Sequence, residues 1–188
     1  MTTIQQINSG TQSATKWLID PAHSEIQFKV KHLMITTVTG YFSKFSLDVE
    51  TEGEDFTKAS SIVFRADINS INTNNEQRDT HLKSPDFFDA TNHSQIEYTG
   101  TTLEKASGNY RLHGNLTIRT VTKPVTLQVE FGGIVKDPYG QTKAGFTVEG
   151  KISRKEFGLT WNAVTEAGSV VVSDEIKIHC EVQLVKQG

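Results

Sequence analysis

The segment at residues 74–89, NNEQRDTHLKSPDFFD, gathers the side chains of this chain that are best suited to chemistry. Arg78, Asp79 and His81 lie within four positions, and Phe87 and Phe88 follow. A carboxylate near an imidazole can transfer protons or bind a metal ion. Apolar side chains directly behind polar ones are instead typical of a lid over an apolar pocket. The segment is therefore a catalytic loop, a metal site or a pocket lid.

A short helix would have to position these residues. Thr73 and Glu76 match a capping box, and Pro85 would end a helix at about Ser84. The sequence therefore predicts a helix at about 75–83, inserted between segments of a different pattern.

The neighbouring polar residues of this helix point in different directions. Arg78 and Asp79 are adjacent, so we expect each to hold the helix to a different partner rather than to form a catalytic pair. His81 lies three residues after Arg78, and either side chain is expected to anchor the helix. These expectations favour a lid with an anchor over a catalytic loop. The residues expected to close part of a pocket are Leu82, Phe87 and Phe88.

The six histidines give little support for a metal site. Positions 23, 32, 81, 93, 113 and 179 contain no pair at the helical spacing of four and no pair at the strand spacing of two. His23 and His32 flank the first regular strand, where each could bind a ligand head group or satisfy a backbone carbonyl. The turn-like sequence DPAHS favours a structural role for His23. We therefore predict no metal.

Other motifs of catalysis are missing from the sequence. Cys180 is the only cysteine, which excludes an internal disulfide and a cysteine-based zinc cluster. It alternates with apolar residues in EIKIHCEVQLV, so we expect a buried hydrophobic side chain rather than a nucleophile. There is no G-x-S-x-G elbow and no glycine-rich phosphate loop. The sequence thus predicts neither a catalytic residue nor a cofactor.

Length and charge point to one domain that does not bind nucleic acid. The chain has 188 residues, a net charge of −3 and a pI of about 6.1, with no basic stripe. No apolar stretch approaches the roughly 20 residues that span a bilayer, so no stable membrane insertion is expected. The polar start, MTTIQQINSGTQSAT, lacks the apolar centre of a signal peptide. We expect a cytoplasmic protein with a flexible segment at 1–15 and one domain at 16–188.

Period-two alternation of apolar and polar residues dominates the rest of the chain. It is clearest in SEIQFKVKH, SIVFRADI, YRLHGNLTI, VTLQVEF, FTVEGKI and EIKIHCEVQLV, and less regular at 38–49 and 95–103. Such runs are typical of strands with one buried face. Turn signals separate them at 51–55, 105–109 and 137–140, and the glycine pair at 132–133 indicates a bend or bulge. About eight such strands predict an all-β sandwich or a barrel, and a barrel leaves no exposed edge.

Five blocks of the chain together resemble the YceI-like family, bacterial polyisoprenoid-binding proteins with a lipocalin-like barrel. The blocks are WLIDPAHSEIQFKVKHL, VTGYFSKF, INSINTNNEQRDTHLKSPDFF, GNLTI followed by KPVTLQVEF, and YGQTKAGFTVEGKISRKEFGL. They stand in the family's order and cover about residues 17–185. The resemblance implies an eight-stranded antiparallel β-barrel with an inserted helix and an apolar tunnel inside. Because many members are periplasmic and members are often dimers, it also adds a periplasmic location and a homodimer as expectations.

The resemblance implies a ligand as well. It is a long-chain apolar lipid, a polyisoprenoid or an isoprenoid-quinone-like molecule, held for transport or storage without catalysis. The alternatives are a fatty acid or fatty amide, an enzyme that acts on a bound lipid, and an interaction module without a cavity. The residue pattern alone favours a barrel filled by its own side chains, and the resemblance favours a tunnel.

The tunnel would be lined by inward-facing residues of the strands and the lid. Large side chains opposite the small Ala66, Gly114 and Gly150 are expected to leave a narrow slot. Trp161, between the last two strands, either gates one end of the barrel or packs over it. The expected lining is Phe28, Val30, Phe42, Phe45, Phe64, Ala66, Leu82, Phe87, Phe88, Gly114, Leu116, Phe131, Phe146 and Trp161. The expected head-group contacts or helix anchors are His23, His32, Arg78, Asp79 and His81.

Overall fold

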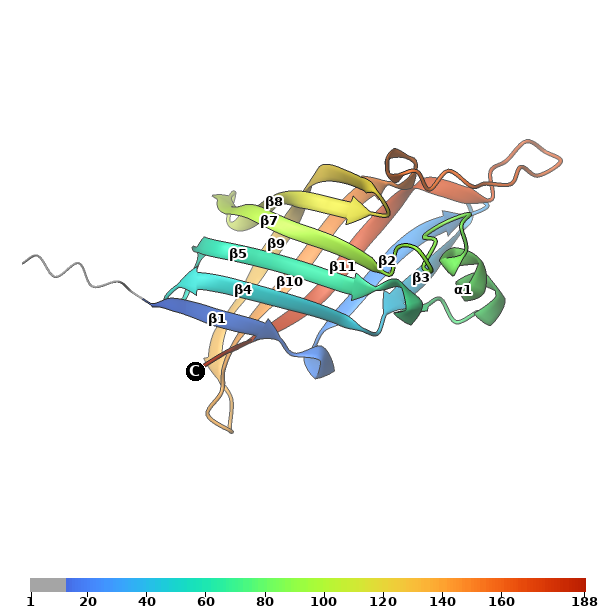
Figure 1. The fold of residues 1–188 in the computed structure, drawn as a ribbon. Helices are drawn as coiled ribbons and strands as arrows, with labels where there is room; N and C mark the ends of the chain where they lie inside the picture. Colours follow the sequence, from blue (N-terminus) through green and yellow to red (C-terminus); the bar gives the residue numbers. More distant parts are fainter. Residues whose placement is uncertain (1–12) are drawn as a thin grey trace, which may run out of the picture.

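A computed structural model describes residues 13–188, which fold into one continuous antiparallel sheet with one α-helix (Figure 1). The strands are β1 (Ala14–Ile19), β2 (Glu25–His32), β3 (Thr36–Phe42), β4 (Phe45–Glu52), β5 (Asp55–Asp67), β6 (Ile71–Asn72), β7 (Gln95–Ala106), β8 (Asn109–Ile118), β9 (Val121–Lys136), β10 (Thr142–Ser153) and β11 (Val172–Lys186). The helix α1 covers Glu76–Lys83, and three 3₁₀ turns are η1 (Pro21–His23), η2 (Ile68–Ser70) and η3 (Arg154–Phe157).

Eight of these strands close a barrel. They pair in the order β1-β4-β5-β7-β8-β9-β10-β11, and β11 pairs with β1 to complete the ring. The predicted eight-stranded antiparallel barrel with an inserted helix is therefore confirmed. The remaining strands extend one end: β2 pairs with the first half of β11, β3 with β2, and β6 with β3. Because β1 and β2 take successive halves of β11, the chain makes a sharp step between them at η1.

The turns form where the turn residues indicated them. Gly53 and Gly108 have φ values of +61° and +85° in the β4–β5 and β7–β8 turns, a conformation that glycine adopts without strain. In the β9–β10 turn, the Asp137 carboxylate accepts hydrogen bonds from the backbone of Tyr139 and Gln141. The expected bulge also forms, because Gly145 pairs with Gly133 but the next residue, Phe146, pairs with Phe131.

The folded domain begins earlier than predicted, with a strand that the sequence did not indicate. Ala14 and Thr15 belong to β1 and pair with Glu52 and Thr51, so the expectation of a flexible segment through residue 15 is wrong at these two positions. Residues 1–12 of that segment lie outside the described part of the chain. The pattern of β1 was too short, at six residues, to show alternation.

The helix α1 matches its predicted range but not its predicted cap. Asn75, not Thr73, is the N-cap, and its side chain accepts a hydrogen bond from the Arg78 N–H. Thr73 is instead buried and bound by other side chains of the helix. The helix ends at Lys83, and its C-cap Ser84 has the extended backbone that the following Pro85 favours.

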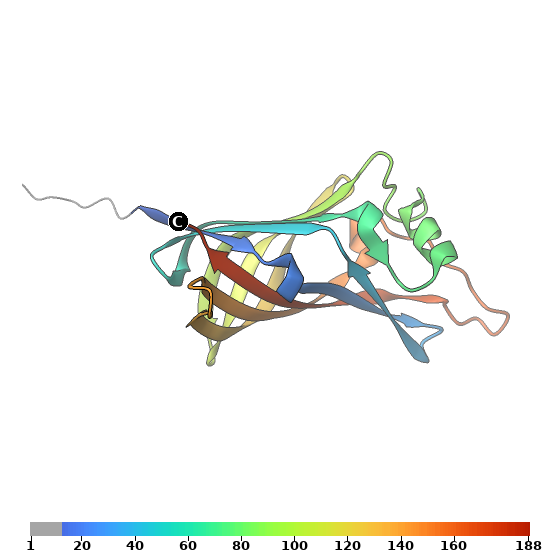
Figure 2. The ribbon, with the colours of Figure 1, turned by 90° about the horizontal axis from the view of Figure 1, so that it is seen from below.

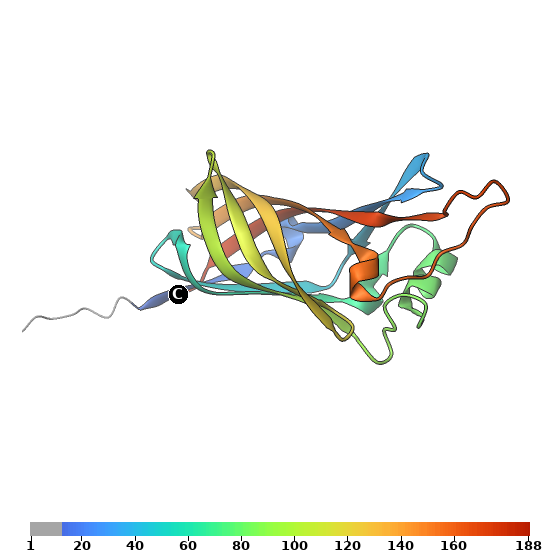
Figure 3. The ribbon, with the colours of Figure 1, turned by 90° about the horizontal axis from the view of Figure 1, so that it is seen from above.

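The two ends of the barrel differ in what covers them. Figures 2 and 3 place α1, the β2–β3 turn and the loop at residues 158–171 together at one end, called here the mouth end. The chain's C-terminus lies at the opposite end, called the closed end. There the aromatic rings pack against one another, with ring centroids 4.9 to 6.0 Å apart. These rings belong to Trp17, Phe56, Phe131 and Phe146.

Candidate functional site

An apolar cavity of about 240 Å³ lies inside the barrel, toward the mouth end. The surface that its wall exposes is entirely apolar. Strand residues line it because alternate side chains of a β-strand point to the same face. The lining consists of Ile26, Gln27, Phe28, Val30, Phe42, Leu47, Ile62, Phe64, Ala66, Leu82, Phe87, Phe88, Ile96, Tyr98, Leu112, Leu116, Ile118, Leu127, Val148, Ile152, Arg154, Leu159, Val172, Ile176, Ile178, Cys180 and Val182.

Most of the residues expected around a tunnel line this cavity. They are Phe28, Val30, Phe42, Phe64, Ala66, Leu82, Phe87, Phe88 and Leu116. Three of them, Leu82, Phe87 and Phe88, come from α1 and the turn after it, which covers the cavity from the mouth end. The lid therefore lies where the sequence placed it, although its contact with a ligand stays a prediction.

Three of the expected phenylalanines lie elsewhere. Phe131 and Phe146 stack at 5.1 Å within the aromatic cluster of the closed end and do not reach the cavity. Phe45, the first residue of β4, packs against the core without lining the cavity. Alternation placed all three correctly on the inner face, but it does not report how far along the barrel axis a residue lies.

The expected slot does not form beside Gly114 and Gly150, although the third small residue, Ala66, does line the cavity. A Cβ atom added to Gly114 would lie 2.5 Å from the Tyr98 ring and 2.5 Å from the Thr99 carbonyl oxygen. A Cβ added to Gly150 would collide with the side chain of Leu127. The neighbouring strands thus fill the space beside these glycines with their own side chains. A bulky residue at Gly114 would therefore collide with Tyr98 and with the backbone of β7.

Arg154, which sequence reasoning omitted from the site, is the only charged residue of the cavity wall in the described part of the chain. Its side chain is 2% exposed. Its guanidinium donates to the carbonyls of Ser173 at 2.9 Å, Leu159 at 2.6 Å, Trp161 at 2.7 Å and Val172 at 3.2 Å. Burial lowers the pKa of this guanidinium, and the nearby Asp174 carboxylate opposes that shift.

Arg154 therefore organises the mouth rather than offering its charge to the cavity. Its four bonds join η3, the start of the 158–171 loop and the start of β11. No periodicity could have found it, because it stands just after the alternating run of β10. It was visible only as part of the block KISRKEFGL in the resemblance.

A groove of about 440 Å³ continues the cavity at the mouth. The two share Phe28, Val30, Leu82, Phe87 and Val172 in their walls. The groove adds polar residues from β2 and α1, among them Lys31, His32, Arg78 and His81. Of the residues that the structure describes, no aspartate or glutamate lines it. A chain held in the apolar cavity could thus place a polar or anionic group here.

Arg78 and Asp79 hold one partner, not two. The Asp79 carboxylate accepts from both the backbone and the hydroxyl of Thr73. The Arg78 guanidinium donates to the same hydroxyl at 2.8 Å and to the Thr73 carbonyl at 2.7 Å. The prediction of different partners is therefore wrong. The pair fixes α1 to the buried residue that precedes it, and Asp79 does not line the groove.

His81 and Trp161 meet at the groove. The imidazole lies edge-on to the Trp161 ring at 4.7 Å and to the Phe87 ring at 5.1 Å, and its Nε2 lies 2.8 Å from an Asp86 oxygen. Trp161 therefore packs over the mouth between the loop and α1. His23 lines neither the cavity nor the groove. Its exposed side chain lies within hydrogen-bond distance of the Asp20 carboxylate at η1.

Two polar side chains of the wall are neutral. Burial raises the pKa of the Tyr98 phenol, whose oxygen lies 2.9 Å from the Val125 carbonyl. Burial also raises the pKa of the Cys180 thiol to about 12, so it is no thiolate near neutral pH. Between residues 13 and 188, no group of three or more His, Cys, Asp or Glu side chains is arranged to hold a metal ion.

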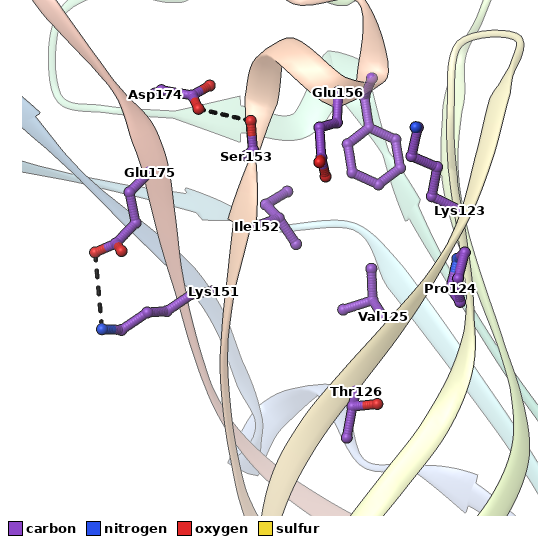
Figure 4. Close-up of a pocket in the computed structure, with 11 residues that line it drawn as sticks. Lys123, Pro124, Val125, Thr126, Lys151, Ile152, Ser153, Glu156, Asp174 and Glu175 are labelled. Atoms are coloured by element: carbon purple, nitrogen blue, oxygen red, sulfur yellow. Dashed lines mark hydrogen bonds and ion pairs between the residues drawn. The ribbon is translucent and has the colours of Figure 1, made fainter.

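A larger hollow, of about 650 Å³, lies outside the apolar cavity (Figure 4). It lies between β9 and β10 where the two strands are no longer paired, since their pairing begins at Gln128 of β9. Figure 4 shows Ile152 and Val125 pointing toward each other across this gap, while Ser153 bonds Asp174 and Lys151 pairs with Glu175. Its polar, open rim suits solvent better than an apolar chain.

Residues 17–184 match the YceI-like domain family. The chain belongs to this family. A UPF0312 protein of Staphylococcus aureus strain USA300 is 36% identical over 172 residues, which is 90% of this chain and 96% of that protein. The family fold agrees with the barrel described above. No helix within the described residues has the length and apolar composition needed to cross a membrane.

Solved structures show the same family fold. The crystal structure of a Campylobacter jejuni YceI protein is 31% identical, with a TM-score of 0.72 over 84% of this chain and 90% of that chain. A polyisoprenoid binding domain from Saccharophagus degradans is 14% identical, with a TM-score of 0.66 over 91% of this chain and 98% of that chain. At this low identity the second likeness concerns the fold alone.

Proposed function

We propose that the protein binds one long-chain apolar lipid, a polyisoprenoid or an isoprenoid-quinone-like molecule, in the barrel cavity. It would transport or store this lipid without reacting with it. The single observation that carries the proposal is the cavity of about 240 Å³ with a wholly apolar surface. The S. degradans domain of the same fold, described as polyisoprenoid binding, supports the choice of ligand class.

The energy of filling the cavity favours hydrocarbon. Each buried CH₂ group contributes roughly 0.8 kcal/mol. Counted by volume, at roughly 24 cal/mol per Å³, filling 240 Å³ recovers on the order of 6 kcal/mol. An eight-stranded barrel is just wide enough for one slender chain. A longer chain would leave the cavity through the mouth groove, which shares part of its wall.

The polar end of such a lipid would lie in the mouth groove. The cavity wall exposes no polar surface, so a head group inside would lose its hydration without a hydrogen bond. The groove supplies Lys31, His32 and Arg78. A fatty acid is the second candidate, because its carboxylate would suit the positive charges of Lys31 and Arg78.

Among the described residues, the cavity wall itself holds no paired acid and base, and the His81–Asp86 pair lies outside it at the mouth groove, which supports binding without catalysis. In the described part of the chain, Arg154 is the only charged lining residue, and backbone carbonyls engage it. An enzyme acting on the bound chain would need a titrating pair at the reacting bond.

The proposal is tested by native mass spectrometry of the protein from its own host, followed by organic extraction. We expect one isoprenoid or quinone per barrel. A fatty acid would select the second candidate, and a folded protein that binds neither would overturn the proposal.

A matched pair of variants locates the ligand. Ile178 lines the cavity, whereas its neighbour Lys177 is exposed on the outer face of β11. Ile178→Trp should lose the bound lipid, and Lys177→Trp should keep it, because the indole fills the cavity only in the first. Circular dichroism must show that both variants fold. Retained lipid in a folded Ile178→Trp variant would exclude the cavity as the site.

A further inference from the structure

Two loops protrude side by side at the mouth end. They are the β2–β3 turn at residues 33–35 and the 158–171 loop (Figures 2 and 3). The Leu33 N–H donates to the Val171 carbonyl at 2.9 Å, and Val171 in turn donates to Ala163 at 3.0 Å. A bridge between Val164 and Val170 continues this ladder outward. The two loops therefore form one small extension of the sheet beyond the barrel.

Exposed apolar side chains gather on this extension. Met34 is 57% exposed, Ile35 76%, Val164 69% and Val170 37%. We call these four residues the mouth tip. The remaining large apolar residues of similar exposure between residues 13 and 188, Val135 and Tyr139, lie on the single β9–β10 hairpin.

The backbone conformation of the β2–β3 turn is one that bulky apolar residues rarely adopt. Leu33 and Met34 have φ values of +51° and +60°, and the Ile35 N–H bonds the His32 carbonyl across the turn. Turns with positive φ at both central positions favour Asn and Gly there, because larger side chains are strained in this conformation. Bulky apolar residues occupy these positions despite the strain, which points to a role outside the fold.

The surroundings of the mouth tip show what it contacts. Lys31 and His32 stand directly behind it on β2, where both also line the mouth groove. Glu166 is the one carboxylate of the 158–171 loop. Apolar side chains at a protruding edge with basic groups behind them match the interface of a bilayer with lipid head groups.

We propose that the mouth tip inserts into the surface of a lipid bilayer and turns the mouth groove toward the membrane. A protein partner or a second copy fits less well, because a stable protein interface buries roughly 1,200–2,000 Å² and the mouth tip offers four side chains on narrow loops. Lys31, His32 and Val171 adjoin the mouth tip and line the groove, which shares part of its wall with the cavity, so docking would bring the groove next to the bilayer. The inference goes beyond the proposed function and does not depend on which molecule fills the cavity.

A fluorophore placed at either end tests this orientation. Cys180 is the only cysteine and is buried, so a single introduced cysteine can be labelled selectively. Met34→Cys labels the mouth tip, and Tyr139→Cys labels the exposed hairpin of the closed end. We mix each labelled protein with vesicles of phosphatidylcholine, with and without phosphatidylglycerol. A blue shift of the emission at position 34 alone is expected. A shift at both positions, or at neither, would overturn the proposal.

A second variant removes the tip without harming the fold. Met34→Gly with Ile35→Thr relieves the positive φ and keeps a strand-compatible residue, so thermal stability should not fall. Flotation with the same vesicles should weaken about tenfold or more, since two apolar side chains no longer enter the lipid. Val135→Thr with Tyr139→Thr is the control and should float like the wild type. Equal flotation of all three proteins would contradict docking through the mouth tip.

Discussion

The closed end and the mouth end of the barrel are built from the same alternating strands but are stabilised differently. At the closed end, aromatic rings contact one another, and Trp17 is fully buried with its indole N–H bonded to the Thr51 hydroxyl at 3.0 Å. At the mouth end, apolar side chains such as Phe28 and Phe64 are only partly buried because they face the cavity. Polar side chains bonded to the backbone hold that end together instead.

The difference shows that the end of the barrel that contains the cavity needs stabilising interactions other than side-chain packing. Packing gives stability only where atoms meet, so the wall of a cavity contributes less than a filled core. Arg154 joins three segments of the mouth through backbone carbonyls, and Arg78 with Asp79 ties α1 to Thr73. Rim bonds thus keep the cavity open where side-chain contact cannot.

The largest expected effect is a difference in the stability lost when an aromatic side chain is removed at each end of the barrel. Trp17→Ala should destabilise the protein by about 4 kcal/mol, because it leaves a large cavity among closely packed rings. Phe64→Ala should cost only about 2 kcal/mol, because part of that ring already faces the cavity. Urea unfolding of both variants in lipid-free protein measures the difference. Equal losses would mean that the two ends are packed alike.

The next effect concerns the rim. Arg154→Met keeps the apolar stem but removes the donor to four backbone carbonyls, so we expect a loss of about 3 kcal/mol. Hydrogen exchange should rise first in the 158–171 loop and the start of β11. Lys155→Met, at the neighbouring exposed position, serves as the control. Unchanged exchange in the loop would show that Arg154 does not hold the mouth.

A smaller effect is expected at the anchor of α1. Asp79→Ala should cost about 1.5 kcal/mol, since it removes a charged acceptor from Thr73. Lipid affinity should change less than stability, because Asp79 lines neither the groove nor the cavity. Asp86→Ala, which breaks only an exposed pair with His81, should stay within about 0.5 kcal/mol of the wild type. A fall in affinity without a fall in stability would make Asp79 a ligand contact.

The sequence predicted the barrel well because the barrel follows from local rules. Alternation marks which face of each strand is buried, and turn residues mark where strands end. It missed β1 because six residues show too little period, and it misplaced the cap of α1 because Thr73 also fits a capping box. Asn75 caps the helix instead, because the Thr73 hydroxyl is already bonded to Arg78 and Asp79. The capping-box pattern does not indicate these side-chain bonds.

The sequence predicted which side chains face the barrel interior, but not how far along the barrel axis each of them lies. Inward alternation placed Phe64 and Phe131 on the same inner face, yet only Phe64 reaches the cavity. Whether an inward-facing ring fills the barrel depends on its packing partners from distant strands. Phe131, for example, packs against Phe56, with the ring centroids 6.0 Å apart. Arg154 carries no periodic signal, because its role depends on four carbonyls that the fold brings together.

The smallest expected effect is a pH dependence at the rim. Burial acts to raise the pKa of the Asp174 carboxyl, but the bonds from the Ser153 hydroxyl and the Lys155 N–H outweigh it, so the pKa is lowered. A carboxyl with a lowered pKa in the folded state stabilises the protein above its unfolded pKa of about 3.9, and this contribution is lost as pH falls through the folded pKa.

Unfolding free energy measured from neutral pH down to acid therefore distinguishes Asp174 from its neighbour. Asp174→Asn should lie below the wild type at neutral pH and converge with it below about pH 4, because protonation removes the same interaction from the wild type. Glu175→Gln should follow the wild type, since its exposed carboxylate makes only a 3.9 Å pair with Lys151. Parallel curves for Asp174→Asn and the wild type would mean that the Asp174 charge does not stabilise the mouth, and that the Arg154 bonds hold the rim without it.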